Sequence, residues 1–126
     1  LRQRGYEIID CGTDSEDSVD YTDHIFEAAE KLASGECVLA IGVCYTGIGS
    51  SIAANKVRGV RASLVEDEER AKLTRGHNDS NMLILASGFL SEDRVISILE
   101  AWLDAAFEGG RHARRVDKVK DYEDKH

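Results

Sequence analysis

The spacing of apolar residues along the chain switches repeatedly between that of strands and that of helices. Short apolar runs bounded by glycine or polar residues predict strands at residues 6–11, 37–43, 61–65 and 82–86. Apolar positions three or four residues apart predict helices at residues 22–33, 50–57, 66–75 and 91–107, followed by a partly helical tail at 111–126. The runs at 37–43 and 82–86 are apolar nearly throughout, which is typical of strands covered on both faces.

Strands that alternate with helices predict an α/β fold of the doubly wound, Rossmann-like class, a three-layer sandwich around a mainly parallel sheet. Residues 1–126 form one predicted domain, because no linker, repeat or low-complexity segment divides the sequence. Residues 1–4 followed by Gly5 have the pattern of a helix's last turn, so we expect a first strand and its helix to be lacking. Ligands of this fold class bind beyond the carboxyl ends of the strands.

Composition and charge narrow the function classes. Of the 126 residues, 42% are hydrophobic and 32% charged, and no apolar run approaches the roughly 20 residues of a membrane helix, so no membrane span is expected. A net charge of −8 repels phosphate backbones, which argues against nucleic acid as a partner. Cys11, Cys37 and Cys44 are an odd number of cysteines without a signal peptide, which indicates free thiols in a reducing cytoplasm.

The stretch CYTGIGSS, residues 44–51, has the composition of an anion-binding turn. Gly47 and Gly49 lie between a predicted strand and a predicted helix, where backbone N–H groups favour a negative charge. The stretch lacks the Gly-Lys-Ser/Thr ending of a Walker loop and the third glycine of the dinucleotide fingerprint. Cys44 is either a small buried hydrophobe or a thiol that the helix N-terminus activates as a nucleophile or base, and the local pattern by itself favours the former.

The stretch GHNDSN, residues 76–81, falls between a predicted helix and the predicted strand at 82–86. Histidine exchanges protons near neutral pH, so His77 is a candidate for proton transfer to a hydroxyl or ring oxygen. The local pattern alone favours a histidine at a helix C-terminus, followed by a turn that Asp79 and Asn81 cap and fix.

The stretch FEGGRHARRV, residues 107–116, concentrates positive charge in an acidic protein. Arg111 and Arg115 are four residues apart, so on a helix their guanidinium groups would share one face and could clamp a phosphate. On such a helix His112 and Arg114 would point away from the face that Arg111 and Arg115 share. The local pattern leaves an alternative open, in which these charged residues form a solvated cluster on the protein surface.

Considered together, six stretches resemble the type B ribose-5-phosphate isomerases and the related galactose-6-phosphate isomerase subunits over nearly the whole chain: GYEIIDCGT, SVDYTD, CYTGIGSSIAANK, GVRASL, HNDSN and FEGGRHARRVDK. The resemblance implies an aldose–ketose isomerase that needs neither metal nor cofactor. It also implies a homodimer with active sites shared between two chains, in which the helical extension at about 111–126 reaches the partner. Pairing of such dimers into tetramers stays open.

The resemblance implies a role for each matching position. Cys44 matches the base that moves a proton between C1 and C2 of the sugar through a cis-enediolate. Thr46 matches a hydroxyl that assists proton movement between the oxygens, and His77 matches the group that opens the sugar ring. The remaining matches are the charge-stabilising amides of Gly47, Ile48, Gly49 and Ser50, the sugar contacts Tyr21 and Asn78, and the phosphate clamp of Arg111 and Arg115.

The sequence departs from the family pattern at three places. The resemblance implies a first strand that ends in an Asp-His pair of the site, and we expect the given sequence to begin after it. Tyr45 stands where the family usually has glycine, and Gly88 stands where many relatives have an arginine near the phosphate. The implied reaction interconverts ribose 5-phosphate and ribulose 5-phosphate. Two alternatives remain: an isomerase of a six-carbon aldose 6-phosphate such as allose or galactose 6-phosphate, and a sugar-phosphate-binding module without catalysis.

Overall fold

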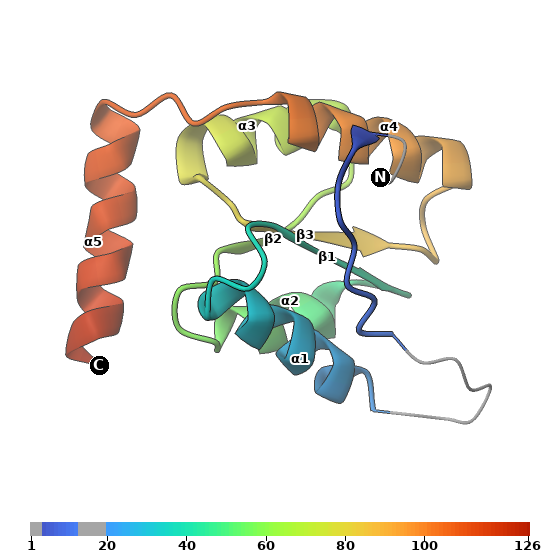
Figure 1. The fold of residues 1–126 in the computed structure, drawn as a ribbon. Helices are drawn as coiled ribbons and strands as arrows, with labels where there is room; N and C mark the ends of the chain where they lie inside the picture. The colour runs from blue at the N-terminus through green and yellow to red at the C-terminus, as the bar shows by residue number, and fades with distance from the viewer. Residues whose placement is uncertain (1–3, 13–19) are drawn as a thin grey trace.

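The computed structural model describes residues 4–12 and 20–126, which form a parallel sheet between two layers of helices (Figure 1). The sheet consists of β1 (Ala40–Cys44), β2 (Ala62–Leu64) and β3 (Met82–Ala86). The strand order is β1-β3-β2 and both pairings are parallel. This architecture confirms the predicted α/β fold class.

The helices lie on both faces of the sheet and at one end of it. Figure 1 shows α1 (Tyr21–Ala33) and α2 (Ile48–Asn55) on one face, with α3 (Glu68–Asn78) and α4 (Glu92–Asp104) on the other. The last helix, α5 (Arg111–Lys125), stands to one side and contacts α3. Over the described residues, none of the helices combines the length and apolar character that crossing a membrane requires.

The central strand β3 connects two hydrophobic cores, because successive side chains of a strand point to opposite faces. Met82 and Ile84 pack into the core under α1 and α2, whereas Leu83 and Leu85 pack against the fully buried Trp102 of α4. All five residues of β3 are buried, as expected for a strand that is paired on both edges and covered on both faces.

Two strand predictions need correction. The predicted strand at 6–11 is wrong, since this segment is irregular chain that pairs with none of the three strands. An apolar pattern shows which residues can be buried, but a strand also needs a hydrogen-bonded neighbour. The run at 37–43 forms a strand only from Ala40, and β1 is an edge strand in which Val43 is 55% exposed. It is therefore not covered on both faces along its length.

Within residues 20–126 each predicted helix is confirmed in position, with shifted ends. α2 begins two residues earlier than predicted because Gly47, at φ 75°, turns the chain into the helix. α3 ends at Asn78 rather than at residue 75, so His77 lies in the last helical turn and not in the connecting turn. A helix end was also predicted at residues 1–4, of which residues 1–3 lie outside the described residues.

Candidate active site

The turn after β1 has the backbone geometry of an anion site, and its glycines are required by close packing. Gly47 has a φ of 75°, and a Cβ at this position would lie 2.5 Å from Cδ1 of Leu64. The hydroxyl of Thr46 accepts a hydrogen bond from the amide of Ile48 at 3.2 Å. The first amides of a helix have no acceptor within it, so next to the Ile48 amide the N-terminus of α2 presents the amides of Gly49 and Ser50 as donors at the carboxyl edge of the sheet.

Cys44 lies at the mouth of this turn as the last residue of β1. Its thiol is 2.5 Å from the hydroxyl of Ser50, which is itself 1% exposed. Its carbonyl accepts a hydrogen bond from the amide of Ser87 at 2.8 Å, which fixes the end of β1 to the chain after β3. Cys44 is only partly buried and also packs against the core under α1 and α2. The thiol thus has a polar partner in the turn as well as an apolar environment.

Two tyrosines border the turn. Tyr21, the first residue of α1, lies so close to Gly49 that a Cβ there would overlap its hydroxyl. Tyr45 is 70% exposed, and its ring packs over Gly88, where a Cβ would lie 2.5 Å from its Cε2. The Tyr45 ring also contacts Phe89, with ring centroids 5.7 Å apart. The two unusual residues Tyr45 and Gly88 are therefore in direct contact.

A second group of side chains surrounds His77 in the last turn of α3. The ring of His112 stacks on that of His77, with centroids 4.1 Å apart and planes 8° from parallel. Nε2 of His77 is 3.5 Å from one carboxylate oxygen of Glu108, and Nε2 of His112 is 3.9 Å from the other. His112 does point away from the exposed Arg111, and its buried ring faces α3.

The environment of His112 favours its neutral form. Burial lowers the pKa of His112 below its ordinary value of 6.5. The charges of His77 and Arg111 lower this pKa further, whereas the carboxylate of Glu108 opposes the shift. The stacked pair therefore contains one imidazole that resists protonation.

The phosphate-clamp candidates lie on the first turns of α5. Arg115 lines an open cavity of about 640 Å³ together with His77, Asn78 and His112. Arg111 is the first residue of α5 and is exposed, but it does not line that cavity. The sequence interpretation missed Glu108 and did not place His112 beside His77. The two glycines after Glu108, both at positive φ, are the signal that could have indicated a chain reversal at this point.

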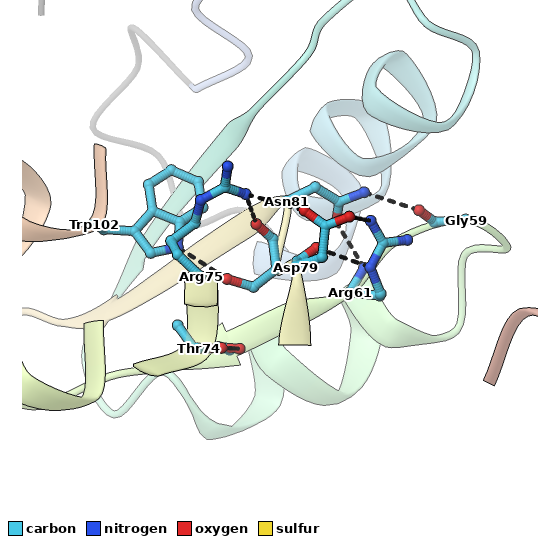
Figure 2. A network of polar contacts seen from close by, with 9 residues as sticks. Gly59, Arg61, Thr74, Arg75, Asp79, Asn81 and Trp102 are labelled. Carbon is cyan, nitrogen blue, oxygen red and sulfur yellow. Dashed lines mark hydrogen bonds and ion pairs between the residues drawn. The ribbon is translucent and has the colours of Figure 1, made fainter. Parts of the chain in front are cut away.

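A polar network fixes the chain that follows His77 (Figure 2). Asp79 ends α3 with φ 48° and its carbonyl accepts a hydrogen bond from Nε of Arg61 at 2.9 Å. The side chain of Asn81 accepts from the amide of Arg61 at 2.7 Å and donates to the carbonyl of Gly59 at 2.9 Å. These contacts confirm that Asp79 and Asn81 cap and fix the turn.

The two groups of candidate residues lie at opposite edges of the sheet. Cys44 ends β1, so its thiol and the α2 N-terminus are at the carboxyl edge. α3 begins after β2 and returns to the start of β3, so His77 is at the amino edge. One edge brings together Cys44, Thr46, Gly47, Ile48, Gly49, Ser50 and Tyr21, and the other brings together His77, Asn78, Arg111 and Arg115. A single chain does not join the two groups.

A thiol beside an anion-binding turn, at the carboxyl edge of a parallel sheet, is an arrangement of α/β proteins that bind small anionic substrates. The chain belongs to the Ribose/Galactose Isomerase family, whose model matches residues 1–119. It is thus a member of a family of sugar-phosphate isomerase enzymes.

Individual relatives agree with this assignment. A ribose-5-phosphate isomerase B of Escherichia coli (strain K12) is 42% identical over 119 residues, covering 94% of this chain and 80% of the relative. A Bacillus subtilis (strain 168) protein, named as a sugar phosphate isomerase without a stated sugar, is 47% identical over 120 residues and covers the same shares. The crystal structure of a Mycoplasma genitalium ribose-5-phosphate isomerase B with bound ribulose-5-phosphate has a TM-score of 0.95 and 40% identity, covering 99% of this chain and 84% of that one.

Proposed function

We propose that the protein interconverts ribose 5-phosphate and ribulose 5-phosphate through a cis-enediolate, with Cys44 as the base. The observation that carries the proposal is the position of the Cys44 thiol, next to Ser50 and at the free amides of the α2 N-terminus. A base beside a cluster of N–H donors is what proton abstraction next to a carbonyl requires, because negative charge develops on the oxygens as the proton leaves.

The chemistry assigns a task to each group of the turn. The Cys44 thiolate removes the proton from C2 of the open-chain aldose, the C–H electron pair forms the C1–C2 double bond, and the π electrons of the C1 carbonyl move to its oxygen. The thiol then returns a proton to C1, after exchange with solvent in part of the turnovers. The amides from Gly47 to Ser50 stabilise the enediolate oxygens. Thr46, whose hydroxyl lies beside the amide of Ile48, assists proton movement between those oxygens. Tyr21, packed over Gly49, contacts the sugar.

We further propose that a second copy of the chain completes the site. Ring opening by His77, sugar contact by Asn78 and phosphate binding by Arg111 and Arg115 all belong to the amino edge, away from Cys44 of the same chain. A homodimer in which the amino edge of one copy faces the carboxyl edge of the other joins the two groups. α5 stands beside the rest of the domain, which supports its role as the extension that reaches the partner (Figure 1).

A second candidate substrate is a six-carbon aldose 6-phosphate. The observation that favours it is the contact of Tyr45 with Gly88, which gives this edge of the site an aromatic surface. Rates with ribose 5-phosphate and with allose or galactose 6-phosphate, compared as kcat/KM, decide between the two substrate classes.

Solvent deuterium tests the reaction itself. In D2O the protein is expected to introduce deuterium at C2 of ribose 5-phosphate and to form ribulose 5-phosphate, both read by NMR. Cys44→Ala is expected to abolish exchange while ribose 5-phosphate still binds, and Cys37→Ala is the matched control. Binding without exchange in the wild-type protein would leave only a binding module, and an active Cys44→Ala variant would remove Cys44 as the base.

The cellular location is part of the proposal. Cys11, Cys37 and Cys44 are all free thiols, which supports a reducing cytoplasm as the place where the Cys44 base acts.

A further inference from the structure

Three side chains with metal-ligating atoms converge at the amino edge of the sheet. They are His77 from the last turn of α3, Glu108 from the segment before α5, and His112 from the first turn of α5. One ligand atom from each lies within 4.8 Å of the other two. A set of two imidazoles and one carboxylate is a recurrent zinc site, and three protein ligands leave a fourth position for water.

The three groups are close together but are not joined by direct hydrogen bonds. Nε2 of His77 and Nε2 of His112 are 3.5 Å and 3.9 Å from the carboxylate oxygens of Glu108, beyond the usual range of an N–H···O bond. Zinc bonds of about 2.0–2.2 Å in tetrahedral geometry separate neighbouring ligand atoms by about 3.3 Å. The in-plane lone pairs of two parallel imidazoles do not meet at one point. A cation shared by the three groups therefore requires the half-exposed His77 ring to rotate out of the stack and the exposed Glu108 carboxylate to follow it.

The backbone holds the three ligands in place. The amide of Glu108 donates to the carbonyl of Gly76 at 3.0 Å, and a Cβ at Gly76 would lie 2.6 Å from the Glu108 carboxylate. Gly109 and Gly110 have φ values of 71° and 58°, and this reversal returns the chain so that His112 faces His77. Close packing at one glycine and positive φ at two others thus build the cluster.

We propose that His77, Glu108 and His112 bind a divalent cation of the zinc class, and that the bound cation blocks His77. Imidazole ligands favour Zn²⁺ over Mg²⁺ or Ca²⁺, which prefer oxygen. The positive Arg115 on the same cavity opposes any cation, so affinity depends strongly on the carboxylate of Glu108. The block rests on the proposed ring-opening role of His77, because a metal on its Nε2 occupies the lone pair that would accept a proton. Cation binding itself does not rest on that role.

Calorimetry with ZnCl2 and the full chain tests the binding. To remove competing thiols, the titration uses a Cys11→Ser/Cys37→Ser/Cys44→Ser variant, which is expected to bind one Zn²⁺ per chain. Glu108→Gln and His112→Asn, each added to this variant, are expected to weaken binding at least tenfold, and Glu100→Gln on the exposed side of α4 is the matched control. Glu108 is largely exposed, so Glu108→Gln keeps the test valid should His112→Asn unfold.

Co²⁺ gives an independent readout, because a tetrahedral site with two imidazoles produces visible absorption that Glu108→Gln should abolish. Zn²⁺ is expected to inhibit isomerisation of the cyclic sugar by the wild-type protein more strongly than by Glu108→Gln, which keeps the competing Cys44 thiol, and EDTA is expected to restore activity. Absence of saturable Zn²⁺ binding, or binding that neither substitution weakens, would overturn the site. Binding that leaves isomerisation unchanged would overturn the block. Calorimetry does not depend on activity, so failure of the isomerase proposal is separate from failure of the metal site.

Discussion

Tyr45 and Gly88 illustrate how one residue determines another across the carboxyl edge of the sheet. The ring of Tyr45 fills the space above Gly88, so a larger residue at 88 requires the ring to move. The resemblance identified these positions separately as departures from the family pattern. Their contact is visible only in the structure, because β1 and β3 are neighbours in the sheet and far apart in the sequence.

This contact predicts that the two positions behave as a coupled pair. Gly88→Arg alone is expected to reduce activity, since the new side chain and the Tyr45 ring need the same space. In the Tyr45→Gly background the arginine has room to meet the phosphate, and KM for ribose 5-phosphate is expected to fall about tenfold through a charge-assisted hydrogen bond. Steady-state kinetics of the wild-type protein, the two single variants and the double variant gives the coupling between the two positions. Additive effects of the two substitutions on KM would contradict that coupling.

The contacts of His112 could not be predicted at the residue level. On an isolated helix it lies off the face shared by Arg111 and Arg115, and that geometry does not indicate what its ring packs against. Its partners come from α3 and from the segment before α5, which helical spacing within 111–126 cannot reveal. Asp79 and Asn81 were predicted correctly because a capping residue acts on its own turn.

The lowered pKa of His112 predicts a specific dependence of stability on pH. A histidine whose folded-state pKa lies below its unfolded value binds fewer protons when folded, so the free energy of unfolding falls as the pH decreases through about 6.5. His112→Asn is expected to flatten this dependence between about pH 7 and pH 5, measured by urea denaturation. His126→Asn at the exposed C-terminus is the control, and an unchanged slope in His112→Asn would refute the assignment.

At the scale of elements, prediction succeeded where a segment's own pattern determines its structure. The strand at 82–86 was predicted with its exact ends, since an apolar run that is buried on all sides leaves one interpretation. The segment 6–11 has a similar pattern and forms no strand, because pairing depends on a neighbour that the pattern does not contain.

A buried hydrogen bond between α4 and the chain that connects α3 to β3 predicts an effect on stability. Nε1 of Trp102 donates to the hydroxyl of Ser80 at 2.9 Å, and both residues are fully buried. Ser80→Ala is expected to lower the free energy of unfolding by about 1–3 kcal/mol, because the indole N–H then lacks an acceptor in an apolar environment. Urea denaturation measures the effect, with the exposed Ser87→Ala as the control.

A double-mutant cycle distinguishes this hydrogen bond from general packing. In a Trp102→Phe background the donor is already gone, so Ser80→Ala is expected to cost much less than in the wild-type protein. An equal cost in both backgrounds would show that Ser80 stabilises the fold by another route.

At the scale of the whole molecule, the separation of the two residue groups has a direct consequence. The stretches around Cys44, His77 and Arg111 were recognised one by one, and nothing local to them indicates which edge of the sheet each occupies. The order of strands and helices indicates the edge, because a helix that returns between two parallel strands carries its last turn to the amino edge of the sheet. The proposed function therefore makes catalysis a property of an assembly of chains.

Mixed oligomers test that consequence. Cys44→Ala and His77→Asn are each expected to be inactive as pure proteins, because every site then lacks one group. When the two variants are refolded together in equal amounts, half of the dimers are mixed, and each mixed dimer pairs an intact Cys44 with an intact His77 at one of its two sites. Activity is therefore expected to return to about a quarter of the wild-type value. Sites built within single chains would give no recovery, because no chain in the mixture carries both residues.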